Sequence, residues 1–250
     1  MCGRFASTTT PGDIVGMFGV RQWDPAETIA PSWNVAPTDP AYAVLERTPR
    51  DGSRQPVRQL RVLRWGLVPA WARSPEGAVR MINARADTVH EKPAYRQAFA
   101  SRRCLLPVDG YYEWQTVPGE RARPGRQPYF VSRADGTPLA LAGLYEFWRD
   151  RTRPADDPLA WRVTCTVVTT EAEPLLAPIH ERMPLFLDPG AFDAWLDPGL
   201  TDPDALRGLL VPPPPGALRV HPVGAAVGNI RNNGPDLVRE LTEDDRTTLF

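Results

Sequence analysis

The chain has 250 residues, of which 42% are hydrophobic and 24% charged, and its 29 basic and 30 acidic residues leave a formal net charge of -1. These values are ordinary for a globular protein and fit one compact domain. They exclude a disordered chain, and no apolar run approaches the ~18 residues that a membrane-spanning helix requires. A near-zero net charge also argues against a nucleic-acid partner, because domains that neutralise phosphates usually carry a positive excess.

Strands alternate irregularly with short helices along the predicted chain. Helical patterns occur at Pro11–Phe18, Pro93–Arg102, Pro189–Leu196 and Asp202–Leu210, the last with Thr201 or Asp202 as its cap. Alternating or β-branched runs predict strands at Ala41–Arg47, Val57–Trp65, Tyr129–Arg133, Leu139–Phe147, Trp161–Thr170 and Ala217–Val223. Segments rich in Pro, Gly and Arg predict loops at Val117–Gln127, Arg151–Pro158 and Pro212–Gly216. Without a regular βαβ alternation, the pattern indicates a β-rich α+β fold.

Cysteine and histidine usage bears on compartment and cofactors. The N-terminus, MCGRFASTTT, lacks the basic start and apolar core of a signal peptide, and the three cysteines include no CxxC pair. His90, His180 and His221 are far apart in sequence, and the chain has neither a P-loop nor a GxGxxG motif. We therefore expect a cytoplasmic protein with no metal and no cofactor.

The near-neutral total hides an uneven distribution of charge. Residues 42–130 contain 16 basic and 8 acidic residues, a net charge of +8, whereas the remainder contains 13 and 22, a net charge of -9. Every basic residue except Lys92 is an arginine, which binds phosphate in a bidentate manner. A GC-rich genome explains the preference for arginine but not its clustering, so the net charge alone does not exclude a phosphate-bearing partner.

Cys2 is the most informative single residue. Removal of Met1 would leave a 1,2-aminothiol, in which the α-amine is partly neutral near pH 7 and the thiol supplies a few per cent thiolate. An aldehyde can form an imine with such an amine, and the sulfur can then close a five-membered thiazolidine. The alternative is a small buried residue near the terminus.

Two further segments carry polar groups suited to chemistry. In INARADTV, residues 82–89, Asn83 and Arg85 face the same side if the segment is extended. An exposed turn is the alternative. In LLPVDGYYEW, residues 105–114, Glu113 is flanked by aromatic residues. A carboxylate in such surroundings is desolvated, which would raise its pKa toward that of a general acid. A solvent-facing carboxylate on an amphipathic strand is the alternative there.

Two other segments are less specific. IHERMPLFL, residues 179–187, places His180 and Arg182 just before a hydrophobic strand, although a lone histidine is often structural. RWGLVPAW, residues 64–71, with Trp33 and Pro37 upstream, offers flat surfaces on which unpaired bases could stack, each contact worth ~1–3 kcal/mol. Core packing is the alternative for these tryptophans.

Taken together, these segments resemble the SOS response-associated peptidase (SRAP) family, whose members crosslink to abasic sites in DNA. The resemblance runs through nearly the whole chain in the family's order. It comprises MCGRF (1–5), WNVAPT (33–38), RWGLVPAWA (64–72), NARADTV (83–89), KPAYRQAF (92–99), RRCLLPVDGYYEW (102–114), AGLYEFW (142–148), TVVTTEA (166–172), IHERMP (179–184) and VGNIRNNGP (227–235). It implies one SRAP domain over residues 1–250, built of barrel-like antiparallel sheets with peripheral short helices.

The resemblance also implies a function and a set of roles. The protein would shield abasic sites in single-stranded DNA by covalent capture, with Cys2 forming first an imine and then a thiazolidine. Glu113 would assist sugar ring opening and proton transfer, His180 would act as a second acid or base, and Asn83 would hold the N-terminal residue. The residues implied to contact DNA are Arg4, Asn34, Pro37, Trp71, Arg85, Trp114 and Arg182.

Several consequences and alternatives accompany this resemblance. The family name implies autoproteolytic removal of leading residues, although ordinary methionine removal suffices where only Met1 precedes Cys2. We expect a monomer that is nucleoid-associated when bound to DNA in a bacterium. One alternative is a glutamine amidotransferase-like hydrolase, which also starts Met-Cys-Gly and uses an N-terminal cysteine nucleophile. The other is a non-covalent single-stranded DNA-binding protein, for which Cys2 is incidental.

Overall fold

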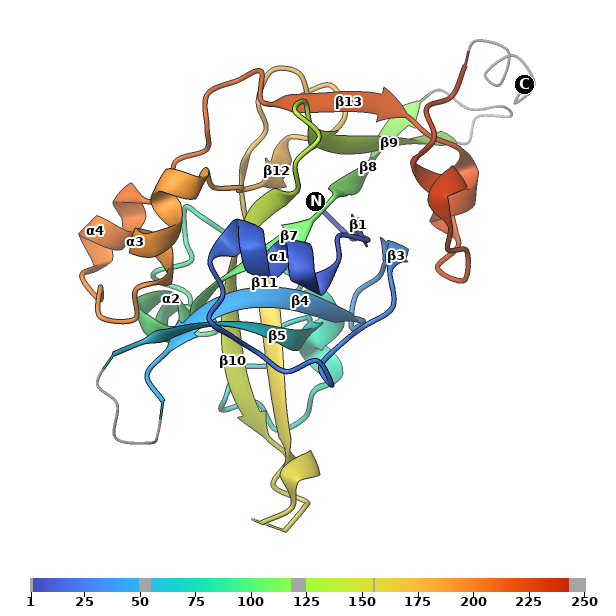
Figure 1. The fold of residues 1–250 in the computed structure, drawn as a ribbon. Coiled ribbons are helices and arrows are strands. Elements are labelled where there is room, and N and C mark those ends of the chain that lie inside the picture. Colours follow the sequence, from blue (N-terminus) through green and yellow to red (C-terminus); the bar gives the residue numbers. More distant parts are fainter. Residues whose placement is uncertain (1, 50–54, 118–124, 155, 243–250) are drawn as a thin grey trace.

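The computed structural model describes residues 2–49, 55–117, 125–154 and 156–242 and shows two sheets with short helices at their periphery (Figure 1). The helices are α1 (Pro11–Phe18), α2 (Arg96–Ser101), α3 (Phe192–Leu196) and α4 (Pro203–Gly208). The strands are β1 (Arg4–Ser7), β2 (Gln22–Trp23), β3 (Ser32–Val35), β4 (Pro40–Arg47), β5 (Val57–Trp65), β6 (Asn83–Arg85), β7 (Arg103–Val108), β8 (Gly110–Val117), β9 (Gly125–Arg133), β10 (Leu139–Arg149), β11 (Trp161–Glu171), β12 (Arg182–Pro184) and β13 (Leu218–Pro222).

Five strands of the larger sheet close into a barrel. The order β11-β10-β7-β4-β5 is antiparallel throughout, and β5 returns to β11 through a parallel pairing in which Arg64 faces Thr164 and Trp65 faces Cys165. A ring with an odd number of strands cannot alternate direction at every step, so one neighbouring pair has to run parallel. The expected barrel-like architecture is therefore confirmed, with a parallel seam that the sequence did not indicate.

The second sheet positions the N-terminus. Its order is β13-β9-β8-β1-β3, and β1 lies between β8 and β3 as an antiparallel strand. Arg4 pairs with Tyr112 and Phe5 with Tyr111, so β8 runs directly alongside the first residues of the chain. The N-terminus consequently lies in the middle of the molecule, next to β1 and β8 (Figure 1).

The barrel strands are apolar on both faces. One face packs against the second sheet in a core that contains Cys2, Phe5 and Tyr111, and the other packs against the helices through residues such as Phe18 and Trp195. Because both faces are covered, β7 is buried along its whole length, as expected for strands covered on both sides. Cys104 and Cys165 are fully buried in the first core.

Local sequence signals explain the helix ends. Thr10 caps α1 by accepting a hydrogen bond from the Asp13 N–H, Pro11 occupies the first turn, and Gly19 ends the helix with φ of 62°. The predicted range of α1 is therefore confirmed. Asp202, rather than Thr201, caps α4 by accepting from the Ala205 N–H at 2.8 Å.

Other predicted ranges need adjustment. The six predicted strands are present, but α2 begins at Arg96 rather than Pro93, because hydrogen-bonded turns at residues 88–95 precede it. The segment expected at 189–196 starts as a short 3-10 turn before α3. Of the predicted loop at 117–127, residues 118–124 lie outside the described residues, and the flanking positions belong to β8 and β9.

Candidate functional site around Cys2

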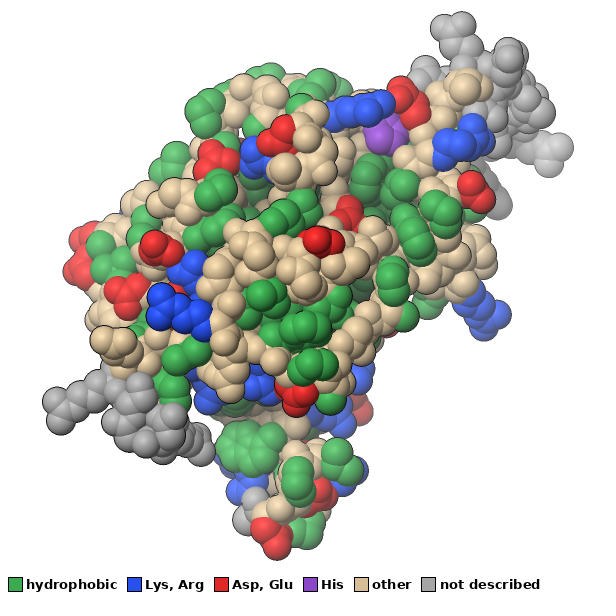
Figure 2. Space-filling view, viewed as in Figure 1, with side chains coloured by type: hydrophobic (Ala, Val, Ile, Leu, Met, Phe, Trp, Pro, Cys, Tyr) green, Lys and Arg blue, Asp and Glu red, His purple; other side chains and the backbone are tan. Residues whose placement is uncertain are grey.

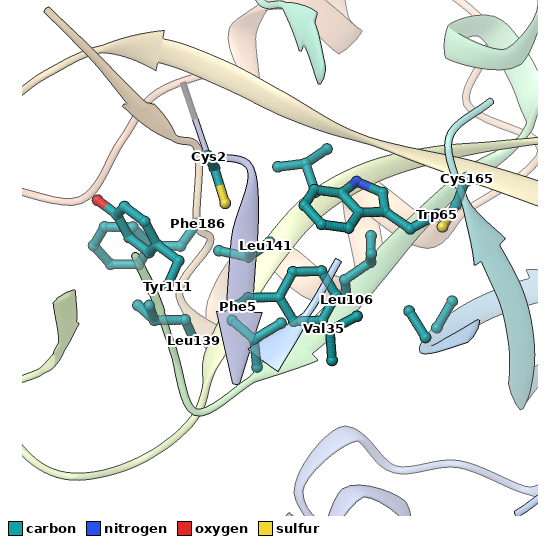
Figure 3. Packing of buried hydrophobic residues seen from close by; sticks show 14 of the residues in the cluster. Cys2, Phe5, Val35, Trp65, Leu106, Tyr111, Leu139, Leu141, Cys165 and Phe186 are labelled. Atoms are coloured by element: carbon teal, nitrogen blue, oxygen red, sulfur yellow. The ribbon is translucent and has the colours of Figure 1, made fainter. Parts of the chain in front are cut away.

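Cys2 lies two residues before the start of β1 and has no exposed surface. Its side chain enters the core beside Tyr111, Leu141 and Phe186 (Figure 3). Burial raises the pKa of the Cys2 thiol well above its usual value, and the negative charge of Glu113 acts in the same direction. In this setting the thiol stays protonated, so it needs a base before it can act as a nucleophile.

Asn83, from the other sheet, holds the Cys2 backbone in place. It begins β6, which pairs in parallel with β11 through Asn83 and Val167. The Nδ2 group of Asn83 donates a hydrogen bond to the Cys2 carbonyl at 2.7 Å, and the Tyr95 hydroxyl donates to the Asn83 carbonyl at 3.2 Å. The bond between Asn83 and Cys2 joins residues 81 positions apart. It uses only the Cys2 carbonyl and does not involve the α-nitrogen or the thiol of Cys2.

Glu113 and His180 complete this group. Glu113 lies on β8 and is 4% exposed, and burial raises the pKa of its carboxyl group while the nearby His180 acts against that rise. His180 is half-buried, and its Nδ1 accepts a hydrogen bond from the Arg182 main-chain N–H at 3.0 Å. A neutral His180 ring therefore carries its proton on Nε2, where it can act as a donor. We call Cys2, Asn83, Glu113 and His180 the reaction group.

Tyr111 adjoins the reaction group and is absent from the sequence-based assignments. Its side chain is 1% exposed, and its hydroxyl has no hydrogen-bond partner among the described residues. Burial raises the pKa of Tyr111 well above its usual value, and the neighbouring Cys2 and Glu113 groups act in the same direction. Alternation along β8 indicates that Tyr111 and Glu113 share a face, the only signal that could have found it.

Arg85 and Arg182 form a second group, the arginine pair. Arg85 is exposed at the end of β6, whereas Arg182 is 8% exposed at the start of β12 and donates from NH2 to the Thr169 carbonyl at 2.6 Å. Burial lowers the pKa of Arg182, and the charge of Arg85 lowers it further. Asp87 contacts both guanidinium groups, at 2.6 Å from Arg85 and 4.0 Å from Arg182, and no local sequence pattern indicates this role.

Arg4, Asn34 and Trp114, on β1, β3 and β8, meet elsewhere in the second sheet. Arg4 donates to the Asn34 Oδ1 at 2.7 Å and to the Val227 carbonyl at 2.9 Å, and it lies 6.0 Å from the centre of the Trp114 ring. The Asn34 side chain is 4% exposed and donates to the carbonyls of Val227, Asn229 and Asn232. Asn34 thus holds Arg4 and the segment 227–232 together, and its amide is occupied within the protein.

Pro37 and Trp71 occupy loops near the barrel rim. Pro37 is half-buried and precedes Thr38, which has φ of 75°, a strained conformation for a β-branched residue. Two hydrogen bonds hold Thr38 in this conformation. Its N–H donates to the Trp65 carbonyl at 2.7 Å, and the Arg64 side chain donates to the Thr38 carbonyl at 2.9 Å. Trp71 is 66% exposed, so its ring is available for stacking.

The arginine-rich stretch does not form one free basic face. Three of its arginines make ion pairs with acidic residues that lie outside residues 42–130. These pairs are Arg58 with Asp193, Arg61 with Glu27, and Arg102 with Glu146. Figure 2 accordingly shows Lys and Arg side chains in separate small groups on the face in view. In the folded protein these ion pairs neutralise part of the local positive charge that the sequence suggested.

Two absences hold for the part of the chain that the structure describes. No three Asp, Glu, His or Cys side chains there come together as metal ligands would. No helix in the same residues is long and apolar enough to span a membrane.

The β-barrel domain thus holds a buried cysteine at position 2, whose carbonyl is bound by an amide and whose thiol lies near a buried carboxyl group. The chain belongs to the SOS response associated peptidase (SRAP) family, whose model matches residues 1–230. This membership sets aside the amidotransferase alternative.

Named relatives and a solved structure agree with this assignment. The chain is 37% identical to the abasic site processing protein YoqW of Bacillus subtilis over 95% of this chain and 99% of that protein. It is 31% identical to the abasic site processing protein HMCES of Xenopus tropicalis, over 96% and 78%. A crystal structure of a Bacteroides thetaiotaomicron protein matches with a TM-score of 0.78 at 24% identity, over 96% and 100%, and supports the fold.

Proposed function

We propose that this protein captures abasic sites in single-stranded DNA covalently, through Cys2 after loss of Met1, and thereby shields the lesion. Relatives named abasic site processing proteins support the substrate class. The observation that carries the chemistry is the reaction group, in which Asn83 anchors the Cys2 carbonyl at 2.7 Å while Glu113 lies buried close to the thiol.

The proposed reaction balances without any oxidant or cofactor. The α-amine of Cys2 adds to the aldehyde of the ring-opened sugar, and one water leaves as the imine forms. The thiol then adds across the carbon–nitrogen double bond, so that a sulfur–carbon bond forms and a proton ends on nitrogen. The product is a thiazolidine, and the net change is the loss of one water.

The reaction group supplies the proton transfers. Glu113, with its raised pKa, can deliver a proton to the sugar ring oxygen as the ring opens and, once ionised, accept the proton of the Cys2 thiol. His180 can donate from Nε2 to the reacting sugar. Asn83 acts by positioning, because it keeps the Cys2 backbone from moving as the two bonds form.

We assign DNA docking to the remaining residues. The arginine pair binds backbone phosphates, and Trp71 and Trp114, with Pro37, pack against bases beside the lesion. NH1 of Arg4 makes two hydrogen bonds inside the protein, and NH2 makes only a long, exposed one of 3.5 Å to the Gly228 carbonyl, so we assign the phosphate contact of Arg4 to NH2. Asn34 contributes by holding Arg4 in place rather than by a free amide.

The test is a denaturing gel of the protein with a single-stranded oligonucleotide containing one abasic site, without borohydride. We expect an adduct for the wild type and none for Cys2→Ala, with Cys165→Ala as the matched control because it removes an equally buried cysteine. Intact mass of the active protein should show Met1 absent. An adduct retained by Cys2→Ala, or Met1 present on the active protein, would contradict the mechanism, and binding without an adduct would leave the non-covalent alternative.

A further inference from the structure

The turn that follows β6 brings a carboxylate against the arginine pair. Asp87 accepts from the Nε of Arg85 at 3.1 and 3.2 Å and from its NH2 at 2.6 Å, a bidentate arrangement. The same carboxylate lies 4.0 Å from NH1 of Arg182. Because the Nε and NH2 of Arg182 are bonded to Thr169, NH1 is the nitrogen that it presents to Asp87.

This carboxylate occupies the kind of position that a phosphate takes. Carboxylate and phosphate oxygens compete for the same planar guanidinium fork. The Arg85 side chain, through its hydrogen bonds to Asp87, lowers the pKa of that carboxyl group, so Asp87 is ionised at neutral pH. Its side chain is half-exposed, which leaves it free to swing into solvent when another anion arrives. The negative charges of Glu171 and Glu181 also raise the pKa of both arginines, but less strongly than that of Asp87.

We infer that Asp87 is an internal competitor of DNA: in the free protein it holds the place between Arg85 and Arg182 that a backbone phosphate takes, and DNA has to displace it. The inference rests on the phosphate role proposed for the arginine pair. Its consequence is weaker docking on undamaged single strands, so that long retention depends on the covalent bond at Cys2 and not on electrostatics.

The experiment measures fluorescence anisotropy with an undamaged, labelled single-stranded oligonucleotide over a series of salt concentrations. Asp87→Asn should bind about three- to five-fold more tightly, the range that loss of one exposed ion pair can supply, and its affinity should fall more steeply with salt. Asp135→Asn is the matched control, since Asp135 holds Arg133 in the same i,i+2 bidentate geometry away from the reaction group. Its affinity should equal that of the wild type.

A double-mutant cycle supplies the second arm. In an Arg85→Ala background the gain from Asp87→Asn should shrink, because the competitor has lost its partner. Equal or weaker binding by Asp87→Asn overturns the inference and makes Asp87 a residue that orients Arg85 for phosphate. Unchanged binding on Arg85→Ala also overturns it, together with the docking role of the arginine pair. A protein that binds as expected but forms no adduct contradicts only the proposed capture chemistry.

Discussion

Two neighbouring tyrosines of β8 allow a sharp test of how hydrogen bonding near the site contributes to stability. Tyr111 and Tyr112 are both buried, at 1% and 0% exposure, and point to opposite faces of the strand. The Tyr112 hydroxyl donates to the Trp33 carbonyl at 2.7 Å, whereas that of Tyr111 has no partner among the described residues. Replacing each with Phe removes one oxygen and leaves the ring packing intact.

The expected free energies differ because only one variant loses a bond. Tyr112→Phe gives up the hydrogen bond to the Trp33 carbonyl, at a cost of about 1 kcal/mol in the free energy of unfolding. In a chain of this length that corresponds to a fall of roughly 2–4 °C in Tm. Tyr111→Phe loses no bond within the described structure, so its free energy of unfolding should stay within about 0.5 kcal/mol of the wild type.

Urea denaturation followed by tryptophan fluorescence, with thermal melts alongside, measures both variants under the same conditions. Equal m-values would show that neither substitution alters the extent of unfolding. If Tyr111→Phe lost as much stability as Tyr112→Phe, the reasoning would be refuted, because the Tyr111 hydroxyl would then have to be bonded in the folded protein.

Two further predictions concern residues of the site. Burial raises the pKa of Glu113 above its usual value near 4.5, so the folded protein binds this proton more tightly than the unfolded chain, and stability falls as pH rises from about 4.5 through the folded pKa. Glu113→Gln should remove this loss, so that its Tm is higher than that of the wild type at pH 8 but not at pH 4. The same variant should form the adduct more slowly. Parallel profiles of Tm against pH for the two proteins would contradict the stability argument. Trp71→Ala should weaken single-strand binding by about 1–3 kcal/mol, the contribution of one stacked base. Its Tm should stay unchanged because the ring is 66% exposed. Unchanged DNA binding by this variant would rule out the stacking role of Trp71.

The sequence predicts the elements that carry their own local signals. The α1 helix has a capping threonine, a proline in its first turn and a terminal glycine, and its predicted ends agree with the structure. The β5 strand, with nine residues, is also long enough to be recognised. By contrast β1, β3, β6 and β12 have three or four residues each, too few to show a period, and they form because neighbouring strands supply their hydrogen bonds.

The site shows the same division. The proposed chemistry at position 2 is suggested by residue type, and the family resemblance implies roles for Asn83, Glu113 and His180. No local pattern, however, places the Asn83 amide on the Cys2 carbonyl across 81 residues. Net charge along the chain misleads in part, because arginines such as Arg58 are paired with acids that only the fold brings near. The burial of Arg182 likewise depends on β11, which covers it with Thr169.

The insertion of β1 between β8 and β3 also sets the order in which the site can come into being. A growing polypeptide leaves the ribosome N-terminus first, so Cys2 emerges long before Asn83 and Glu113, and longer still before Val227, to which Arg4 is bonded. During that interval Cys2 is uncovered and open to the processing that would free its amine. Once the later strands arrive Cys2 is enclosed, so the removal of Met1 that we propose would have to take place during synthesis, before the fold is complete.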